Sequence, residues 1–378
     1  MTATREPLVI AEQGHFFTGI RQRHTAFGTS VTGTHVGYQV PGVVRYGNLL
    51  LVHGGGGQAL DMLTTPDGRE GWATLFLRDG FAVYTVDRPG FGRSPYHPAL
   101  YAEIGPPATY GSFVASFAGP APEGLPAHTQ WPGGGSADDP ALAQFLAWQE
   151  PFPGASLERM HEDMRDGAEG LLDRIGPSVL LTHSMGGGFG WLAASSRRSL
   201  VRAIVAVEPA GPPFVTLPGI GAFSQGLTSL PLSFGPGEDE GKLDGLPVAF
   251  VSGESSPLGP ATHESAEFLR RCGASVTEIR LGELGIHGNG HAMMLEKNNA
   301  EISAVITAWI ASVLDTTTAH TTSTSQSSVA DTTTPTTSTT PTTSTTPTTS
   351  TTPTTRATTT HTPPPPHTSS APSAPPVL

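Results

Sequence analysis

The sequence has little cysteine, few positive charges and no clustered basic residues. Cys272 is the only cysteine, so the chain forms no internal disulfide and offers no cysteine-rich metal site. Its 20 lysines and arginines are outnumbered by 32 aspartates and glutamates. Nucleic acids and anionic membranes bind through a cationic footprint. Neither is therefore an expected partner.

Long apolar runs are also missing. Residues 1–7 have no apolar stretch after a basic patch, and no later segment reaches the roughly 18 apolar residues of a membrane-spanning helix. We therefore expect neither a signal peptide nor a membrane anchor, and the sequence predicts a cytoplasmic protein.

The C-terminal part, residues 316–378, consists mainly of Thr, Ser and Pro, with a proline at every sixth position between 335 and 353. Such a segment has too few apolar side chains to offset the entropy of ordering. It predicts a disordered tail after a globular domain over residues 6–315. An exported chain would carry O-linked sugars on such a tail, but the predicted cytoplasmic location favours a tail without chemical function.

Within residues 6–315, apolar runs of strand length alternate with amphipathic helical patterns over 72–77, 157–175 and 299–314. The first two strands are expected to be antiparallel. Alternation of this kind predicts an α/β fold, with a mostly parallel sheet covered by helices on both faces. Functional residues are then expected at the carboxyl ends of the strands. The predicted strands are 16–19, 35–40, 48–53, 81–87, 178–183, 201–208, 247–252 and 275–281.

The alternation stops between about residues 95 and 158, where proline, glycine and aromatic residues such as Trp131 and Phe145 are frequent. A structureless loop of this length is uncommon in a compact domain. We expect a partly helical cap insertion with a helix over 141–149. Its apolar side chains would line a substrate pocket.

One apolar run, Ser178–His183, ends directly in Ser184, and Met185 and three glycines follow. The pattern approaches G-x-S-x-G, the nucleophile elbow that raises a serine above a parallel sheet. Thr182 replaces the first glycine. Small residues after a strand also serve only to let a helix pack closely, so the motif alone does not decide the function.

A serine nucleophile needs a base to remove its proton, a carboxylate to orient that base, and donors for the oxyanion. His291 is the candidate base, on a glycine-rich loop before the last predicted helix. His287 competes with it by position. His183 adjoins the serine and is expected to be structural.

Two glutamates are candidates for the acid, because each follows a strand and gives the order serine, acid, histidine. Position alone slightly favours Glu254, which follows the strand over 247–252. Pro209 supports Glu208, since proline fixes the direction of the chain that leaves the strand. The residue pattern leaves both candidates open.

Four glycines, Gly54–Gly57, follow the buried strand over 48–53. Their backbone can approach a ligand closely, and the N–H groups of Gly55 and Met185 are the expected oxyanion donors. A phosphate-binding loop is disfavoured, because no Lys-Ser or Lys-Thr pair follows. The segment 87–94 is predicted to brace this loop, and Ser94 is not expected to be a nucleophile.

With these residues in place, the chain over about residues 8–314 resembles the α/β-hydrolase superfamily. It looks most like microbial esterases whose triad acid follows the sixth strand. The segments that carry the resemblance are Leu51–Gly56, Thr65–Arg69, Val86–Gly90, Gln130–Gly133, Thr182–Gly186, Val207–Pro212 and Gly288–His291.

The resemblance implies Ser184 as nucleophile, Glu208 as acid and His291 as base, which overturns the positional preference for Glu254. It also implies a carboxylic-ester substrate, no cofactor and no metal. Some relatives have a vicinal cysteine pair where this chain has two glycines, so properties tied to that pair are not carried over.

The predicted function is a serine hydrolase that cleaves small-molecule carboxylic esters through an acyl-enzyme. The same triad on a lactone, an amide or a carbon–carbon bond is the alternative within enzymes. A non-catalytic binding protein on the hydrolase fold is the alternative from another class. The oligomeric state stays open.

Overall fold

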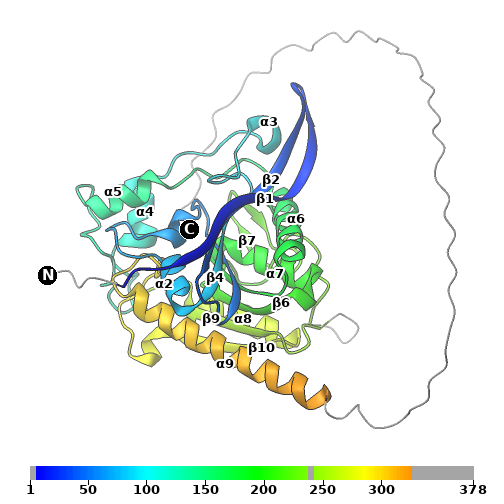
Figure 1. Cartoon of the computed structure of the whole chain (residues 1–378). Helices are drawn as coiled ribbons and strands as arrows, with labels where there is room; N and C mark the ends of the chain where they lie inside the picture. Colours follow the sequence, from blue (N-terminus) through cyan, green and yellow to red (C-terminus); the bar gives the residue numbers. More distant parts are fainter. Residues whose placement is uncertain (1–5, 237–241, 326–378) are drawn as a thin grey trace, which may run out of the picture. The chain divides into compact units, whose positions relative to one another are not determined.

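The computed structural model describes residues 6–236 and 242–325, and a mixed β-sheet forms its centre (Figure 1). The strands of this sheet are β1 (Ile10–Thr25), β2 (Gly28–Pro41), β3 (Gly47–Val52), β4 (Phe81–Asp87), β5 (Ser178–His183), β6 (Val201–Val207), β9 (Pro247–Ser252) and β10 (Ser275–Arg280). They lie in the order β1-β2-β4-β3-β5-β6-β9-β10. A separate small pair is formed by β7 (Thr216–Leu217) and β8 (Gly221–Ala222).

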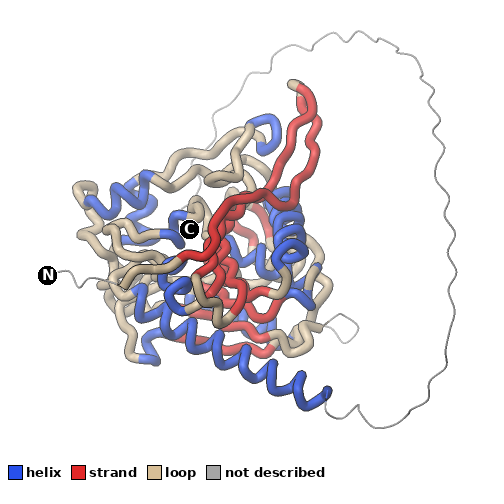
Figure 2. The backbone as a smooth tube through the Cα atoms, viewed as in Figure 1, coloured by secondary structure: helices blue, strands red, loops and turns tan. Residues whose placement is uncertain are grey.

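The sheet is antiparallel at its start and parallel elsewhere. β2 pairs antiparallel with both β1 and β4, and the pairs from β4 through β3, β5, β6 and β9 to β10 are parallel. The predicted mostly parallel sheet with an antiparallel opening pair is confirmed. The opening strands are longer than predicted, because they continue as a hairpin (Figure 2). It turns at Ala26 and Phe27, and Gly28, whose φ is 117°, begins β2.

Helices and short helical turns connect the strands. The α-helices are α1 (Leu60–Leu63), α2 (Trp72–Asp79), α3 (Pro98–Tyr101), α4 (Tyr110–Phe113), α5 (Pro140–Ala147), α6 (Leu157–Ile175), α7 (Gly187–Ser196), α8 (Gly259–Arg271) and α9 (Asn299–Ser325). The short turns are the π-helical η1 (Val114–Ala118) and the 3₁₀ turns η2 (Ser184–Gly186), η3 (Arg198–Leu200) and η4 (Leu281–Leu284). α6 has the predicted bounds, because Ser156 caps its first turn and Gly176, with φ 81°, ends it.

Alternate residues of the central strands face opposite sides of the sheet, as the period of a strand requires. Leu49 and Leu51 pack with the apolar faces of α2 and α9, whereas Leu50 and Val52 pack with α6, α7 and α8. Each fully buried side chain of this size contributes about 1.5–3 kcal/mol. Helices therefore cover both faces, as predicted.

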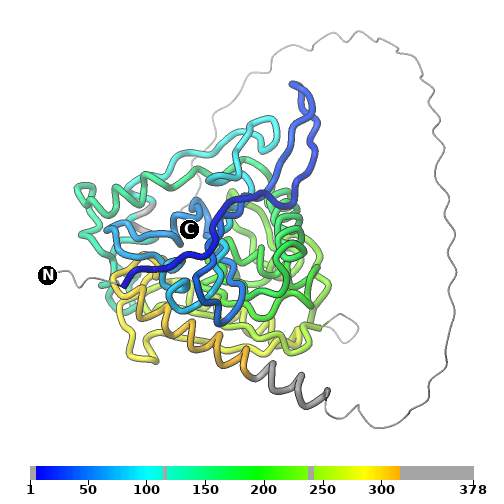
Figure 3. Tube along the Cα trace, viewed as in Figure 1, coloured from blue at the N-terminus to red at the C-terminus, as the bar shows by residue number. Residues whose placement is uncertain are grey.

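On one face, α2 and α9 lie side by side although they are far apart in the sequence (Figures 1 and 3). Nε1 of Trp72 donates to the backbone oxygen of Asn299 at 2.9 Å. α9 continues beyond residue 315, where the sequence predicts the tail to begin, because no proline interrupts the chain before Pro335. The rest of the predicted tail, 326–378, lies outside the described residues. No helix in the described ranges is long and apolar enough to cross a membrane.

Before α6 begins at Leu157, the segment over residues 95–158 contains only short helices: α3, α4, η1 and α5. The helix predicted over 141–149 is α5. It begins one residue earlier, because the side chain of Asp139 accepts the backbone N–H of Ala141, and it ends at Ala147. Trp131 and Phe145 join the core cluster on the α2 and α9 side of the sheet.

The parallel register brings the carboxyl ends of the central strands to one edge. Val52 of β3 pairs with Thr182 of β5, and His183 pairs with Val207 of β6. β9 ends level with β6, since Val207 also pairs with Val251. The residues after these strands therefore gather at the same edge of the sheet, which is where open α/β sheets bind ligands.

Candidate active site

Ser184 stands on a sharp turn between β5 and α7. Its φ is 50°, a left-handed conformation that costs a non-glycine residue about 1–3 kcal/mol. Gly186 makes the turn possible, because a Cβ there would lie 2.4 Å from the backbone oxygen of His53. Strand, strained turn and helix are the geometry of a nucleophile elbow.

Thr182 occupies the position where the elbow motif has its first glycine. Its side chain is fully buried. A Cβ added to Gly190 of α7 would lie 3.3 Å from Cγ2 of Thr182. The space left by Gly190 is therefore what accommodates the larger residue at the elbow.

Glu208 and His291 form a buried pair. Nδ1 of His291 lies 2.6 Å from Oε2 of Glu208, whose exposure is 0%. Oε1 of Glu208 accepts the backbone N–H of Gly253 at 2.9 Å, and Oε2 accepts the hydroxyl of Ser256 at 2.6 Å. Because a carboxylate only accepts, Nδ1 of His291 carries the proton and Nε2 has the free lone pair.

The two competing candidates meet each other at the surface. Nδ1 of His287 lies 3.1 Å from Oε2 of Glu254, and the His287 side chain is 66% exposed. The hydrogen bond from His287, then that from the N–H of Gly288, lowers the pKa of Glu254. The structure thus brings Glu208 together with His291, and Glu254 with His287.

The loop that holds His291 is organised by Glu296, which is fully buried. Oε1 of Glu296 accepts the N–H of Gly290 at 2.8 Å and contacts Nε2 of His128 at 2.8 Å. Oε2 accepts Nδ2 of Asn289 at 2.6 Å. His128 belongs to the segment over 95–158, so this segment is tied to the loop of His291.

Arg69 holds the other end of that loop. Its guanidinium donates to the backbone oxygens of Leu295 and Glu296 at 2.9 and 2.8 Å, and to Oδ1 of Asn299 at 2.8 Å. Nε of Arg69 donates to Asp67 at 2.7 Å. The segment Thr65–Arg69 therefore acts as a clamp on the start of α9.

His183 supports His291 and is no competitor for the role of base. Burial, and then the charge on His291, lowers the pKa of His183 well below its ordinary value. The neutral ring donates from Nε2 to the backbone oxygen of His291 at 3.0 Å, and the two rings are 4.5 Å apart.

The glycine loop after β3 lies against Ser184. A Cβ at Gly54 would lie 2.7 Å from Nδ1 of His183, and one at Gly55 would lie 2.6 Å from the ring of Phe152 and 3.2 Å from Cγ of Met185. Only glycine fits these two positions without a shift of the neighbours. Among the described residues, the N–H of Gly55 donates no hydrogen bond.

The turn after β4 braces the glycine loop, as predicted. Nη2 of Arg88 donates to the backbone oxygen of Gly54 at 2.6 Å, and the N–H of Arg88 donates to Nε2 of His53 at 2.9 Å. Burial, then the charge of Arg88, lowers the pKa of His53 to about 3, so this ring is neutral. Ser94 is buried and donates to the backbone oxygen of Asp87 at 2.7 Å.

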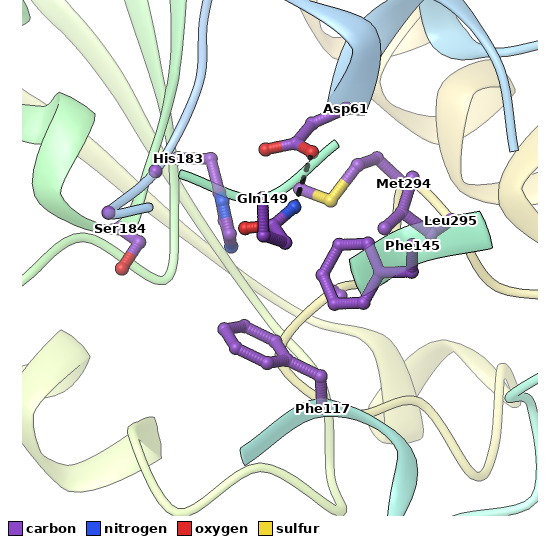
Figure 4. A pocket seen from close by; sticks show the side chains of 11 residues that line it. Asp61, Phe117, Phe145, Gln149, His183, Ser184, Met294 and Leu295 are labelled. Carbon is purple, nitrogen blue, oxygen red and sulfur yellow. Dashed lines mark hydrogen bonds between the residues drawn. The ribbon is translucent and has the colours of Figure 1, made fainter. Parts of the chain in front are cut away.

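A cavity of about 20 Å³ adjoins Ser184 (Figure 4), which is room for about one water molecule. Its wall is apolar apart from Ser184, His183, Gln149 and Asp61. The complete lining is Gly54, Gly55, Asp61, Phe117, Phe145, Gln149, His183, Ser184, Ala292, Met294 and Leu295. Phe117, Phe145 and Gln149 come from the segment over 95–158, and the ring of Phe117 stacks on His291 with a centroid distance of 5.6 Å.

Ser184 Oγ makes no hydrogen bond within the described part of the chain. Its link to Nε2 of His291 is therefore not formed in this arrangement. Hydrogen bonds between nucleophile and base are often long before substrate binds, so proton transfer requires the two side chains to move together.

Sequence reasoning missed Asp61, whose carboxyl group borders the cavity. A signal was present, because Asp61 is the one charged residue within the apolar stretch Ala59–Leu63. Burial raises the pKa of Asp61 to about 7, while hydrogen bonds from Trp148 and Gln149 act in the opposite direction.

One group of side chains in the described ranges has the spacing of a metal site: His263, Glu267 and Glu278 on α8 and β10. Glu278 is already paired with Arg270 and Arg280 at 2.9 and 3.0 Å. None of these residues lines the cavity next to Ser184.

Comparisons with known proteins agree with the fold of this chain. A family model described as alpha/beta hydrolase fold matches residues 47–229. A protein from Fungal sp. (strain ATCC 74256) named "Probable secreted lipase phiG" is 36% identical over an alignment 296 residues long, which covers 69% of this chain and 81% of that protein. A solved structure described as a novel bacterial esterase has a TM-score of 0.64 and 25% identity, over 82% of this chain and 98% of that chain.

The name of the fungal relative corrects one prediction. The cytoplasmic location predicted from the sequence is wrong, because this relative is named as secreted and points to an extracellular protein. The prediction rested on the lack of an apolar run in residues 1–7, and a lack of this kind does not exclude export.

Proposed function

The chain belongs to the α/β-hydrolase superfamily, and on this premise we propose that it is a serine hydrolase that cleaves carboxylic esters through an acyl-enzyme. One observation carries the proposal: the strained Ser184 and the buried pair of Glu208 and His291 lie at the same edge of the sheet. The names of the fungal lipase and the bacterial esterase support an ester as substrate.

In the first half-reaction, Oγ of Ser184 attacks the ester carbonyl carbon while Nε2 of His291 takes the hydroxyl proton. The carbonyl electrons move to its oxygen, and the N–H groups of Gly55 and Met185 donate to this oxyanion. When the bond to the alcohol breaks, His291 gives its proton to the leaving oxygen. An ester on Ser184 remains.

In the second half-reaction, water attacks the acyl carbon and His291 takes one of its protons. Collapse of the new tetrahedral intermediate releases the carboxylic acid, and His291 returns the proton to Ser184 Oγ. No other reactant is consumed.

Glu208 orients the base and stabilises its charged form. The N–H of Gly253 and the hydroxyl of Ser256 fix the carboxylate, which in turn accepts Nδ1–H of His291. This bond keeps the Nε2 lone pair directed away from Glu208, so that it is available to Ser184. As His291 gains a proton, the buried carboxylate offsets the new positive charge.

We place this activity outside the cell, on small-molecule esters, following the name of the fungal relative. The Thr-rich segment that follows the hydrolase domain is then compatible with O-linked glycosylation of an exported chain.

Turnover of para-nitrophenyl butanoate and of the corresponding anilide tests the proposal. The wild type should hydrolyse the ester much faster than the anilide, and Ser184→Ala should lower ester turnover by at least about a thousandfold. Ser196→Ala, at the half-buried C-terminal end of α7, is the matched control. Equal turnover by wild type and Ser184→Ala would refute the proposal.

A further inference from the structure

Asp61 is a carboxylate built into the wall of the cavity beside Ser184. It lies in α1, is 6% exposed, and is the only acidic residue among those that line the cavity. The other lining side chains from the segment over 95–158 and from the loop after His291 are mainly apolar. A carboxylate in such surroundings is costly unless its oxygens find donors.

Only one of its two oxygens has donors. Oδ1 of Asp61 accepts Nε1 of Trp148 at 2.9 Å and Nε2 of Gln149 at 3.2 Å. Oδ2 accepts no hydrogen bond from any described residue, yet it is not among the fully buried polar atoms without a partner. In Figure 4 this second oxygen lies on the side of His183, away from Gln149. Oδ2 therefore has accessible lone pairs at the cavity.

The surrounding residues hold the carboxylate in this orientation. Gly57 leaves room for the carboxylate in this position, because a Cβ there would lie 1.9 Å from Oδ2. Trp148 and Gln149 follow α5 directly, and the N–H of the next residue, Glu150, donates to the backbone oxygen of Gly56 at 2.7 Å. The glycine loop and the end of α5 together fix where Oδ2 points.

We propose that Asp61 determines substrate specificity: its Oδ2 accepts a hydrogen bond from a hydroxyl group that the substrate ester extends into this cavity, which has room for one group of that size. This inference rests on the proposed esterase function. The ionised form of the carboxyl group only accepts, so its partner has to be a donor. A polar site of this kind selects strongly against substrates that leave it unpaired.

A hydroxyl fits better than an ammonium group. The guanidinium of Arg88 is buried nearby and acts electrostatically on Asp61, so it repels a second cation. Phe117, Phe145 and Leu295 offer an ammonium group no further anion. Transfer from water to this apolar wall costs a neutral hydroxyl less hydration free energy than it costs an ammonium group.

The test compares matched esters with and without a hydroxyl. Para-nitrophenyl hexanoate, ω-hydroxyhexanoate and ω-aminohexanoate, and the pair butanoate and β-hydroxybutanoate, place the group in the acyl chain. Ethyl and hydroxyethyl butanoate place it in the alcohol. The measured quantity is the ratio of kcat/KM for the hydroxylated ester to kcat/KM for its parent.

In at least one pair, the wild type should prefer the hydroxylated ester, and Asp61→Leu should lower the ratio by about tenfold or more. Asp61→Asn is the second variant, for use if Asp61→Leu does not fold. It keeps an acceptor for Trp148 and Gln149. It should lower the ratio several-fold. Asp163→Asn, which removes a buried carboxylate paired with Arg23, should leave the ratio unchanged.

Ratios that agree between wild type and both Asp61 variants in every pair would overturn the proposal. A preference for ω-aminohexanoate over ω-hydroxyhexanoate that Asp61→Asn abolishes would overturn the choice of a hydroxyl. Labelling of Ser184 by a fluorophosphonate tests the esterase function separately from the role of Asp61. Labelled enzyme with unchanged ratios refutes the role of Asp61 alone, whereas failure to label the wild type refutes the esterase function.

Discussion

Oε2 of Glu208 lies 2.6 Å from Nδ1 of His291, and the carboxylate is fully withdrawn from solvent. Such a contact fixes both the tautomer and the direction of the imidazole. Glu254, which follows β9, the next strand of the sheet, instead pairs with the exposed His287.

This difference predicts unequal effects of two matched substitutions. Glu208→Gln should lower kcat for a para-nitrophenyl ester by about a hundredfold or more, because an amide does not hold the required tautomer. Glu254→Gln should change kcat by no more than about threefold, as expected for an exposed ion pair. Circular dichroism serves as the control for folding. A larger loss in Glu254→Gln than in Glu208→Gln would reverse the assignment.

The left-handed backbone of Ser184 predicts how substitutions at this position change the free energy of unfolding. Glycine adopts φ of 50° without the steric cost of a Cβ. Ser184→Gly should therefore be more stable than Ser184→Ala by about 1 kcal/mol in urea unfolding. At Ser196, the last residue of α7, the same pair should show the opposite order, since glycine is a weaker helix former than alanine. The same order at both positions would contradict the strain at the elbow.

Asp61 predicts a pH-dependent stability. Burial raises its pKa in the folded state to about 7 from an unfolded value of 3.8, so the folded state binds the proton more tightly. Rising pH between these two values therefore lowers the free energy of unfolding, by at most about 1.4 kcal/mol per pH unit. Asp61→Asn removes this loss and should gain stability relative to the wild type between about pH 5 and about pH 8.

Asp139→Asn is the matched control for that measurement. Asp139 is also buried, but the N–H donors of Gly135, Trp131 and Ala141 outweigh its burial and lower its pKa. Its contribution to stability is complete above the unfolded pKa, so Asp139→Asn should cost the same at both pH values. An Asp61→Asn variant whose stability difference from wild type does not change with pH would argue against a raised pKa.

The sheet and its main helices could be predicted because their patterns are local. The alternation of Leu49, Leu50 and Leu51 faces two cores, and the spacing from Leu157 to Ile175 gives the bounds of α6. The positions of Ser184 and Glu208 after strands, and of His291 in the loop before α9, also follow from local sequence. The choice between Glu208 and Glu254 does not, because both leave parallel neighbours at the same edge.

Other features depend on contacts between distant segments. Asp61 borders the cavity only because α1 packs beneath Trp148 and Gln149, which are 87 and 88 residues away. The role of Glu296 depends on His128, 168 residues away. The segment over 95–158 lacks a regular period, so its fold is set by such tertiary contacts.

Mass spectrometry after treatment with a fluorophosphonate tests the central claim most directly. The wild type and Ser196→Ala should gain a single phosphonyl group on the peptide that contains Ser184, and Ser184→Ala should gain none. The label should appear at the rate at which ester turnover is lost. Undiminished labelling of Ser184→Ala, or a label on Ser94 instead, would contradict the assignment of Ser184 as the nucleophile.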